Sequence, residues 1–144
     1  MKFRSTFRAV LVALSLFVVA DLAAARESEM LQMGRQEIVD ADATALTVTA
    51  LRAAIIEGGL RRGWRAIGDK PGVLILETHS GEHRVLVDVA YDAKGYQIRY
   101  RSSENMNYAQ TGTKVTIHPK YNRWIEGLNI SIRNAAVDAQ AIAR

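Results

Sequence analysis

The sequence predicts an α+β fold: a small antiparallel β-meander of three or four strands, flanked by an N-terminal and a C-terminal helix that pack on one face of the sheet. Three observations predict it. A stripe of apolar residues at helical spacing begins near Val48, four short strand-like runs follow, and a second helical stripe begins near Pro119. The links between the strand-like runs are too short for crossover helices, so the strands are expected to be antiparallel. The apolar sides of the helices then cover the apolar face of the sheet.

The first 25 residues have the three parts of a secretory signal peptide. Lys2, Arg4 and Arg8 give a positive start, residues 9–20 form an apolar run, and small residues up to Ala25 supply an AxA cleavage site. A membrane-spanning helix needs about 20 apolar residues, and this run is shorter. We therefore expect cleavage after Ala25, export to the periplasm and a mature protein with no stable membrane span.

Composition limits the remaining function classes. The chain of 144 residues contains no cysteine, which excludes disulfides, thiolate metal sites and a lipid-modified N-terminal cysteine. Cleavage leaves 119 residues with 16 basic and 14 acidic side chains, a net charge of +2 that gives no support to a nucleic-acid partner. This length suits one domain, so we expect a polar lead-in over residues 26–46 and a single α+β domain over residues 47–144.

The lead-in allows a short strand at Gln36 to Val39, and the first helix is predicted from Val48 to Arg62. Thr47 is a suitable N-cap, and the apolar stripe consists of Val48, Leu51 and Ile55. Gly58 and Gly59 near its end cost about 1 kcal/mol each relative to alanine. The last turn is therefore expected to be frayed or pressed closely onto a neighbour.

Four strand-like runs bounded by turn residues follow: Trp64 to Ile67, Val73 to Thr78, His83 to Ala90 and Tyr96 to Ser102. The last two alternate between apolar and polar residues, so one face of the sheet is expected to be buried and the other solvated. The second run begins with four apolar residues, which is typical of an interior strand.

The residues from Ser103 to His118 are expected to form a loop, and the second helix is predicted from Pro119 to Ala136. Proline suits the first position of a helix. A single apolar stripe runs along this segment and consists of Tyr121, Trp124, Ile125, Leu128 and Ile132.

Residues suited to ligand binding gather around this loop. The candidates are Tyr100, Asn105, Asn107, Tyr108, His118, Tyr121 and Asn122. Aromatic rings beside amides suit a sugar or a peptide of the cell wall. The same residue types also supply hydrogen bonds that tie a loop to a helix end. We favour the second interpretation and keep the first as the alternative.

The segments YQIRYRSSENMNY at residues 96–108 and IHPKYNRW at residues 117–124 resemble a family of small proteobacterial envelope proteins, many described as lipoproteins. Those proteins carry similar YxIxYxxSxNxxY and IHPxYNRW motifs, a GW pair after the first helix and a valine-rich VD strand. The matching residues here are Gly63, Trp64, Val87, Asp88, Tyr96, Ile98, Tyr100, Ser103, Asn105, Tyr108, His118, Tyr121, Asn122, Arg123 and Trp124. The resemblance covers about residues 48–128 and implies an envelope location without an established activity. The missing lipobox cysteine departs from the lipoprotein members and gives no support to membrane anchoring.

The sequence gives weaker support to three other chemistries. His79 and His83 flank a turn and could meet across it to bind zinc or copper, but two ligands without a third rarely define a site. Ser102 or Ser103 with His118 and Asp88 has the residue types of a hydrolase triad without any motif that places them.

A basic sheet face formed by Arg84, Arg99 and Arg101 could meet anionic lipid headgroups or wall polymers, although Asp88 on the same face would neutralise part of its charge. We favour a solvated face with exposed ion pairs.

The sequence therefore favours a non-enzymatic periplasmic module that binds a protein or a cell-wall component of the envelope, with no cofactor. The alternative is a small enzyme or a metal-binding protein that uses His118 or the His79 and His83 pair.

Overall fold

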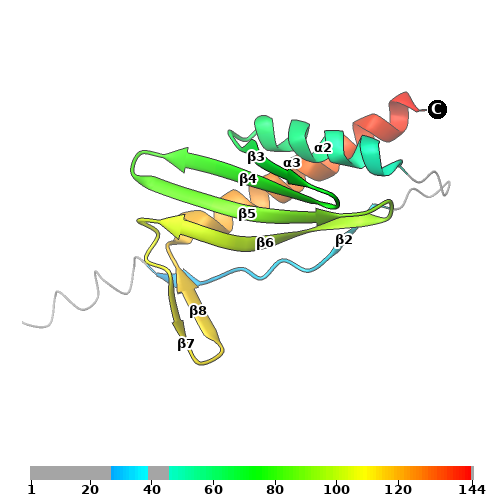
Figure 1. Ribbon diagram of the computed structural model, residues 1–144. Coiled ribbons are helices and arrows are strands. Elements are labelled where there is room, and N and C mark those ends of the chain that lie inside the picture. Colours follow the sequence, from blue (N-terminus) through cyan, green and yellow to red (C-terminus); the bar gives the residue numbers. More distant parts are fainter. Residues whose placement is uncertain (1–26, 39–45, 144) are drawn as a thin grey trace, which may run out of the picture.

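The computed structural model describes residues 27–38 and 46–143. The predicted signal peptide and its cleavage site after Ala25 lie outside the described residues. A five-stranded antiparallel sheet has the order β2-β6-β5-β4-β3, and two helices cover one of its faces (Figure 1). The strands are β2 (Gln36–Glu37), β3 (Arg65–Lys70), β4 (Val73–Ser80), β5 (His83–Tyr91) and β6 (Gly95–Glu104), and the helices are α2 (Val48–Leu60) and α3 (Pro119–Ile142). The predicted α+β class, with both helices on one face, is confirmed.

The four predicted strands form a meander from β3 to β6, and two of its three turns contain a glycine with positive φ. Gly72 follows Pro71 with a φ of 76°, and Gly81 has a φ of 60° between β4 and β5. Backbone with positive φ suits glycine because a Cβ would clash there. The short strand expected at Gln36 is β2, which pairs with β6 and extends the meander by one strand.

The middle strand, β5, shows how the two faces of the sheet differ. Val85, Val87 and Val89 are fully buried under the helices. Leu86 and Asp88 alternate with them and are only half-buried on the face that no helix covers, called here the open face. The predicted contrast between a buried and a more solvated face is confirmed.

The helices begin where their caps predict, but their apolar stripes differ in detail from expectation. The Thr47 hydroxyl accepts a hydrogen bond from the N–H of Ala50 at 3.0 Å, as an N-cap does. Leu51 and Ile55 are fully buried, whereas Val48 is 46% exposed. In α3, Tyr121, Ile125, Leu128 and Ile132 are buried, but Trp124 is only half-buried. Trp124 therefore lies at the border of the stripe, and it lines a surface cleft that is described below.

Gly58 is the point of closest approach between the helices. An ideal Cβ built on Gly58 would lie 2.6 Å from the Cα of Ile132 and 2.8 Å from the carbonyl oxygen of Ser131. Real Cβ atoms do not approach main-chain atoms this closely, so only glycine permits this contact. The last turn of this helix was expected to be either frayed or pressed closely onto a neighbour, and the close contact at Gly58 confirms the second expectation.

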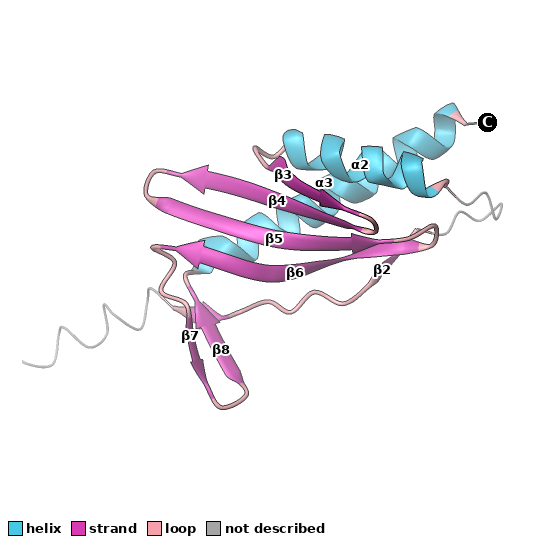
Figure 2. Cartoon of the chain, viewed as in Figure 1, coloured by secondary structure: helices cyan, strands magenta, loops and turns pink. Residues whose placement is uncertain are grey.

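The segment expected to be a loop contains a β-hairpin, and that expectation is corrected. β7 (Ala109–Thr111) and β8 (Lys114–Ile117) pair with each other, and β8 also pairs with β1 (Ser28–Glu29), giving a second sheet of order β1-β8-β7. Figure 2 shows this hairpin projecting away from the main sheet. Its strands have only three and four residues, so their alternation was too short to stand out in the sequence.

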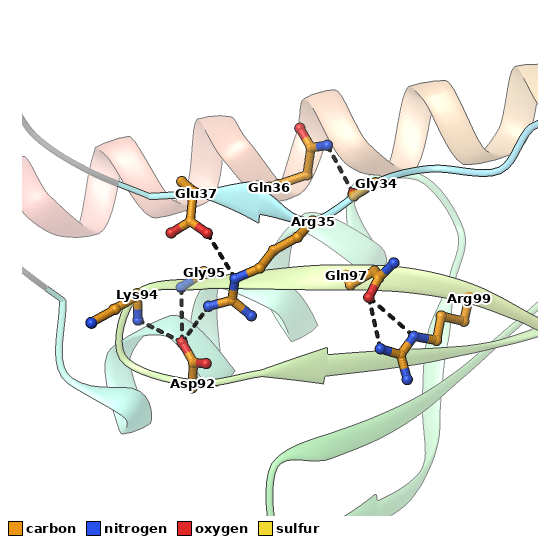
Figure 3. Close-up of polar contacts among 9 residues, drawn as sticks. All are labelled: Gly34, Arg35, Gln36, Glu37, Asp92, Lys94, Gly95, Gln97 and Arg99. Atoms are coloured by element: carbon orange, nitrogen blue, oxygen red, sulfur yellow. Dashed lines mark hydrogen bonds and ion pairs between the residues drawn. The ribbon is translucent and has the colours of Figure 1, made fainter.

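The N-terminal segment, residues 27–38, joins the two sheets along the edge of the domain (Figure 1). Figure 3 shows the polar contacts at its β2 end, where Arg35 donates to the Asp92 carboxylate at 2.6 Å. The same Asp92 oxygen accepts from the main-chain N–H groups of Lys94 and Gly95. These bonds lower the pKa of Asp92, the Lys94 bond most strongly and Arg35 next. A Cβ on Gly95 would collide with the Gln36 carbonyl oxygen, so glycine is what lets β2 reach β6.

Within the described residues, neither helix has the length and apolar character needed to cross a membrane.

The two adjacent glycines of α2 give opposite predictions. We expect Gly58→Ala to lower the free energy of unfolding by about 1–3 kcal/mol or more, because the new methyl group overlaps the backbone of α3. Gly59→Ala is the matched control, since its Cβ would meet the end of the Leu76 side chain at 3.4 Å, and alanine favours the helix by about 1 kcal/mol. Urea unfolding of both variants measures the difference. Equal destabilisation of the two variants would contradict the proposed contact.

Candidate functional site

Three of the seven candidate residues form an aromatic stack at the root of the β7–β8 hairpin. The rings of Tyr100 and Tyr108 are parallel, with centroids 4.7 Å apart, and Tyr121 meets Tyr100 edge to face at 5.8 Å. Tyr121 is buried, and burial raises the pKa of its hydroxyl. Tyr108 is 42% exposed. The stack thus extends from the core at Tyr121 to the surface at Tyr108.

Asn105 and Asn107 shape the turn between β6 and β7. Both have positive φ, 54° and 50°, a conformation that asparagine tolerates better than most residues. The side-chain amide of Asn105 donates to the Glu82 carbonyl oxygen at 2.8 Å. The main-chain carbonyl oxygen of Asn105 lies 2.7 Å from Nδ1 of His83. Because a carbonyl oxygen only accepts, His83 carries its proton on Nδ1. Asn105 therefore ties this turn to the tip of the β4–β5 hairpin, whereas the exposed side chain of Asn107 makes no such tie.

His118 closes the hairpin and begins α3. The imidazole Nδ1 of His118 accepts a hydrogen bond from the main-chain N–H of Lys120 at 3.1 Å, as a side-chain N-cap does. The main-chain N–H of His118 donates to the Met106 carbonyl oxygen at 2.7 Å. The His118 and His83 rings lie 5.0 Å apart. Nδ1 of His118 is thus already occupied by the backbone in this structure.

Asn122, one turn into α3, is directed toward the N-terminal segment. Its amide oxygen accepts the N–H of Leu31 at 2.9 Å, and its amide nitrogen donates to the Glu29 carbonyl at 2.9 Å and to the Ser28 hydroxyl at 3.3 Å. This pattern satisfies main-chain groups of a segment that has few strand partners of its own.

The seven candidates therefore lie on one continuous region, but most of their polar atoms serve the fold. Asn105, His118 and Asn122 bond to main-chain groups, and Tyr121 is in the core. Three candidates are exposed: Asn105, Asn107 and Tyr108. Asn105 is tied to Glu82, so Asn107 and Tyr108, which lead into the projecting hairpin, are the exposed candidates without a main-chain partner for their side chains among the described residues. This geometry supports the favoured interpretation, in which these residues supply hydrogen bonds that tie the segment before α3 to the start of the helix.

The strand register separates the residues of the two other proposed sites. In the β4–β5 pair, His79 lies opposite Arg84 and His83 opposite Ser80, so the two imidazoles are on opposite faces of the sheet. No group of three or more His, Cys, Asp or Glu side chains that could hold a metal occurs among the described residues.

The hydrolase triad also does not assemble. Asp88 is on the open face, where it pairs with Arg101, whereas His118 is at the start of α3, which covers the opposite face. The Ser103 hydroxyl lies 3.0 Å from the Tyr100 hydroxyl. The sequence alone could not show that Asp88 and His118 are separated, because the face that a strand residue occupies depends on the strand register.

The basic side chains expected on the open face are engaged by neighbours. Arg101 donates to Asp88 at 2.9 Å, and Arg99 donates to the Gln97 amide oxygen at 2.7 Å, as Figure 3 shows for the second pair. These contacts support the favoured interpretation of a solvated face with exposed ion pairs, which contribute little each.

Arg84 forms the central ion pair of that face. It donates to Glu77 at 2.5 Å and to Glu104 at 2.7 Å, and His79 lies 3.4 Å from the second Glu77 oxygen. The Arg84 hydrogen bond lowers the pKa of Glu77, against an opposing effect of desolvation.

A cleft of about 280 Å³ lies at the same end of the sheet and was not predicted. Its lining residues come from the turn between α2 and β3, the end of β4 and the first turns of α3: Arg62, Gly63, Trp64, Thr78, His79, Ser80, Arg123, Trp124 and Gly127. The sequence does place Arg123 beside Trp124 and Arg62 near Trp64. Nothing in the one-dimensional pattern brings the two pairs together, because they meet only when α2 packs on α3.

Comparisons with protein-family models, with curated proteins and with solved structures gave no match. The resemblance to small envelope proteins therefore stays a prediction from the sequence, and the function is argued from the geometry.

Asn122 provides a direct test of the scaffold interpretation. We expect Asn122→Ala to lower the free energy of unfolding by about 1–3 kcal/mol, because it leaves main-chain groups of the N-terminal segment without their partners. Hydrogen exchange should also become faster at Leu31, whose N–H loses its acceptor. Asn134→Ala, at an exposed position of the same helix, is the matched control. An Asn122 variant as stable and as protected as the control would show that the tie is unimportant.

Glu77 gives a prediction for the dependence of stability on pH. Its folded pKa lies below the ordinary value of 4.5, so the unfolded chain binds protons more readily at acidic pH. The stabilisation is present above pH 4.5 and is lost as the pH falls through the lowered folded pKa. Unfolding experiments from pH 6 down to about pH 3 should therefore show a shallower acid loss in Glu77→Gln than in the parent. Glu82→Gln, at the exposed hairpin tip, should keep the parent slope.

Proposed function

We propose that this chain is an exported, non-enzymatic binding module of the cell envelope, and that the β7–β8 hairpin is the surface that meets its partner. One observation carries the proposal: a hairpin with an exposed first strand and an exposed turn projects away from the main sheet (Figures 1 and 2). All three residues of β7 are exposed, as are the turn residues Gly112 and Thr113. Met106 and Ile117 at the root are fully buried. An exposed hairpin that is anchored by buried residues at its root is better suited to binding a partner than to stabilising the fold.

The open edge of β7 indicates the class of partner. Gly112 has a φ of 60° at the first position of a two-residue turn, which makes Thr111 and Lys114 the hydrogen-bonded closing pair. Because bonded and non-bonded pairs alternate, the main-chain N–H and C=O of Gln110 face the open edge. Among the described strands β7 pairs with β8 alone. An extended segment of an envelope protein would add here as a further strand.

The export and envelope parts of the proposal have separate support. Residues 1–25 have the composition of a signal peptide, and the IHPKYNRW stretch resembles that of small envelope proteins. The geometry adds that His83 and His118 Nδ1 are engaged with main-chain groups, an arrangement more suited to a scaffold than to catalysis.

The experiment compares two substitutions at one position. Gln110→Pro removes the N–H from the open edge, whereas Gln110→Ala removes the same side chain and keeps the N–H. A photo-crosslinking side chain at Thr113, activated in cells and followed by mass spectrometry of the periplasmic fraction, should capture a protein partner in the parent and in Gln110→Ala. We expect about tenfold less adduct in Gln110→Pro, because a main-chain bond is lost and the ring blocks strand addition.

A crosslinker at Ala53, exposed on α2, is the positional control and should give no such adduct. Equal adducts from Ala53 and Thr113, or an adduct that survives Gln110→Pro, would rule out the hairpin edge as the binding surface.

A further inference from the structure

The cleft between α2, β4 and α3 contains two arginines that the fold leaves without partners. Most described arginines pair with carboxylates or with a glutamine oxygen. Arg62, Arg65 and Arg123 are the described arginines whose side chains make no hydrogen bond or ion pair with described residues. Two of these three line the same cleft. Two unpaired cations beside one cleft repel each other unless an anion lies between them.

The tryptophan beneath the cleft adds a second, independent observation. Trp64 is only 2% exposed, yet its indole N–H donates no hydrogen bond to the described residues. No completely shielded side-chain nitrogen or oxygen in the described part of the chain lacks a partner. The N–H of Trp64 must therefore reach the surface, and the cleft is the surface that Trp64 lines. An indole N–H only donates, so this group requires an acceptor.

The chemistry of the lining selects the ligand. The lining contains two guanidinium groups, the indole N–H groups and the hydroxyls of Thr78 and Ser80, and no carboxylate. The Thr78 hydroxyl already donates to the Gly63 carbonyl, and the strand register places the His79 side chain on the open face near Glu77. A phosphate monoester carries a charge of about −1.5 to −2 near neutral pH and has three acceptor oxygens, which matches two guanidinium groups. A single carboxylate would neutralise only one of them.

We propose that this cleft, here named the Arg–Trp cleft, is a binding site for a small phosphate monoester. Arg62 and Arg123 hold the phosphate, the Trp64 N–H donates to one of its oxygens, and the rest of the molecule lies against the half-buried ring of Trp124. A volume of about 280 Å³ exceeds what a bare phosphate needs and suits a small organic body. The site is separate from the hairpin edge, so neither proposal depends on the other.

The binding experiment uses the protein's own fluorescence, because both tryptophans of the chain line the cleft. Glycerol 3-phosphate is titrated into the purified protein, with glycerol and succinate as comparison ligands. We expect a saturable change with glycerol 3-phosphate and none with glycerol. Binding of succinate with equal affinity would overturn the phosphate assignment.

Arginine substitutions test the site itself. Arg62→Gln and Arg123→Gln should each weaken the affinity about tenfold or more, because each removes a charged hydrogen-bond donor. Arg65→Gln removes an equally unpaired arginine outside the cleft and should leave the affinity within about twofold. An equal loss in Arg65→Gln would show that only net charge matters and would overturn the proposal.

A third variant blocks the cleft without removing charge. A Cβ on Gly127 would lie 3.8 Å from the guanidinium of Arg62, an ordinary contact, so a side chain can grow into the cleft from there. Gly127→Leu should keep the stability of the parent, since leucine is a better helix former than glycine, and should abolish binding. A stable Gly127→Leu variant that still binds would contradict the proposed location.

Vesicle sedimentation distinguishes the two sources of the phosphate group. Vesicles containing phosphatidic acid, compared with pure phosphatidylcholine, present the monoester as a lipid headgroup. Sedimentation that requires both Arg62 and Arg123, without binding of soluble glycerol 3-phosphate, supports the proposal with a lipid as the source. Binding of the soluble ester supports a free ligand. Failure of both probes overturns the proposal.

Discussion

The main-chain contact between α2 and α3 at Gly58 is the constraint on which the rest of the fold depends. The backbones approach so closely that a single methyl group at this position would overlap the Cα of Ile132. This distance lets two helices lie side by side on one meander, so that Ile55 from α2 and Leu128 from α3 both reach the same buried sheet face. The same contact brings the end of α2 onto the first half of α3, which places Arg62 beside Gly127 and forms the Arg–Trp cleft. The geometry of a core contact thus determines where a candidate binding surface lies.

Segments outside that two-layer core are held mainly by side chains that bond to main-chain groups. Asn105 ties the β6–β7 turn to the neighbouring hairpin, Asn122 holds the N-terminal segment against α3, and Asp92 closes the β5–β6 turn while it pairs with Arg35. Short strands such as β1 and β2 have only two residues each and supply few ladder bonds of their own. Asparagine and aspartate supply the missing partners because their short side chains reach main-chain groups near them. The amide-rich composition of this region is therefore explained by the fold.

One stretch of α3 serves all of these parts of the structure. His118 caps the helix, Tyr121 enters the core, Asn122 holds the N-terminal segment, and Arg123 and Trp124 line the cleft. Successive helical residues are 100° apart, so neighbours in the sequence necessarily face different parts of the molecule. The projecting hairpin and the cleft are both at the end of the sheet where β4 ends, β5 begins and β6 ends. A protein partner on the hairpin and a small phosphate ester in the cleft would accordingly approach the same end of the domain.

Local patterns in the sequence were sufficient for the class of the fold, the starts of its two helices and the four strands of the meander, whereas α3 continues to Ile142, beyond its predicted end at Ala136. Each of these depends on periodicity, a cap such as Thr47 or a turn residue such as Gly81, and all of them act within a few residues. The hairpin at residues 109–117 was missed because its strands are too short to show a period. The functional surfaces depend on long-range geometry. The register of β4 on β5 places His79 and His83 on opposite faces, and helix packing brings Arg62 together with Arg123. The sequence by itself therefore determined the helices and the strands of the meander, whereas the tertiary structure decided the short hairpin, which side chains meet and which remain available, because those contacts join residues from distant parts of the chain.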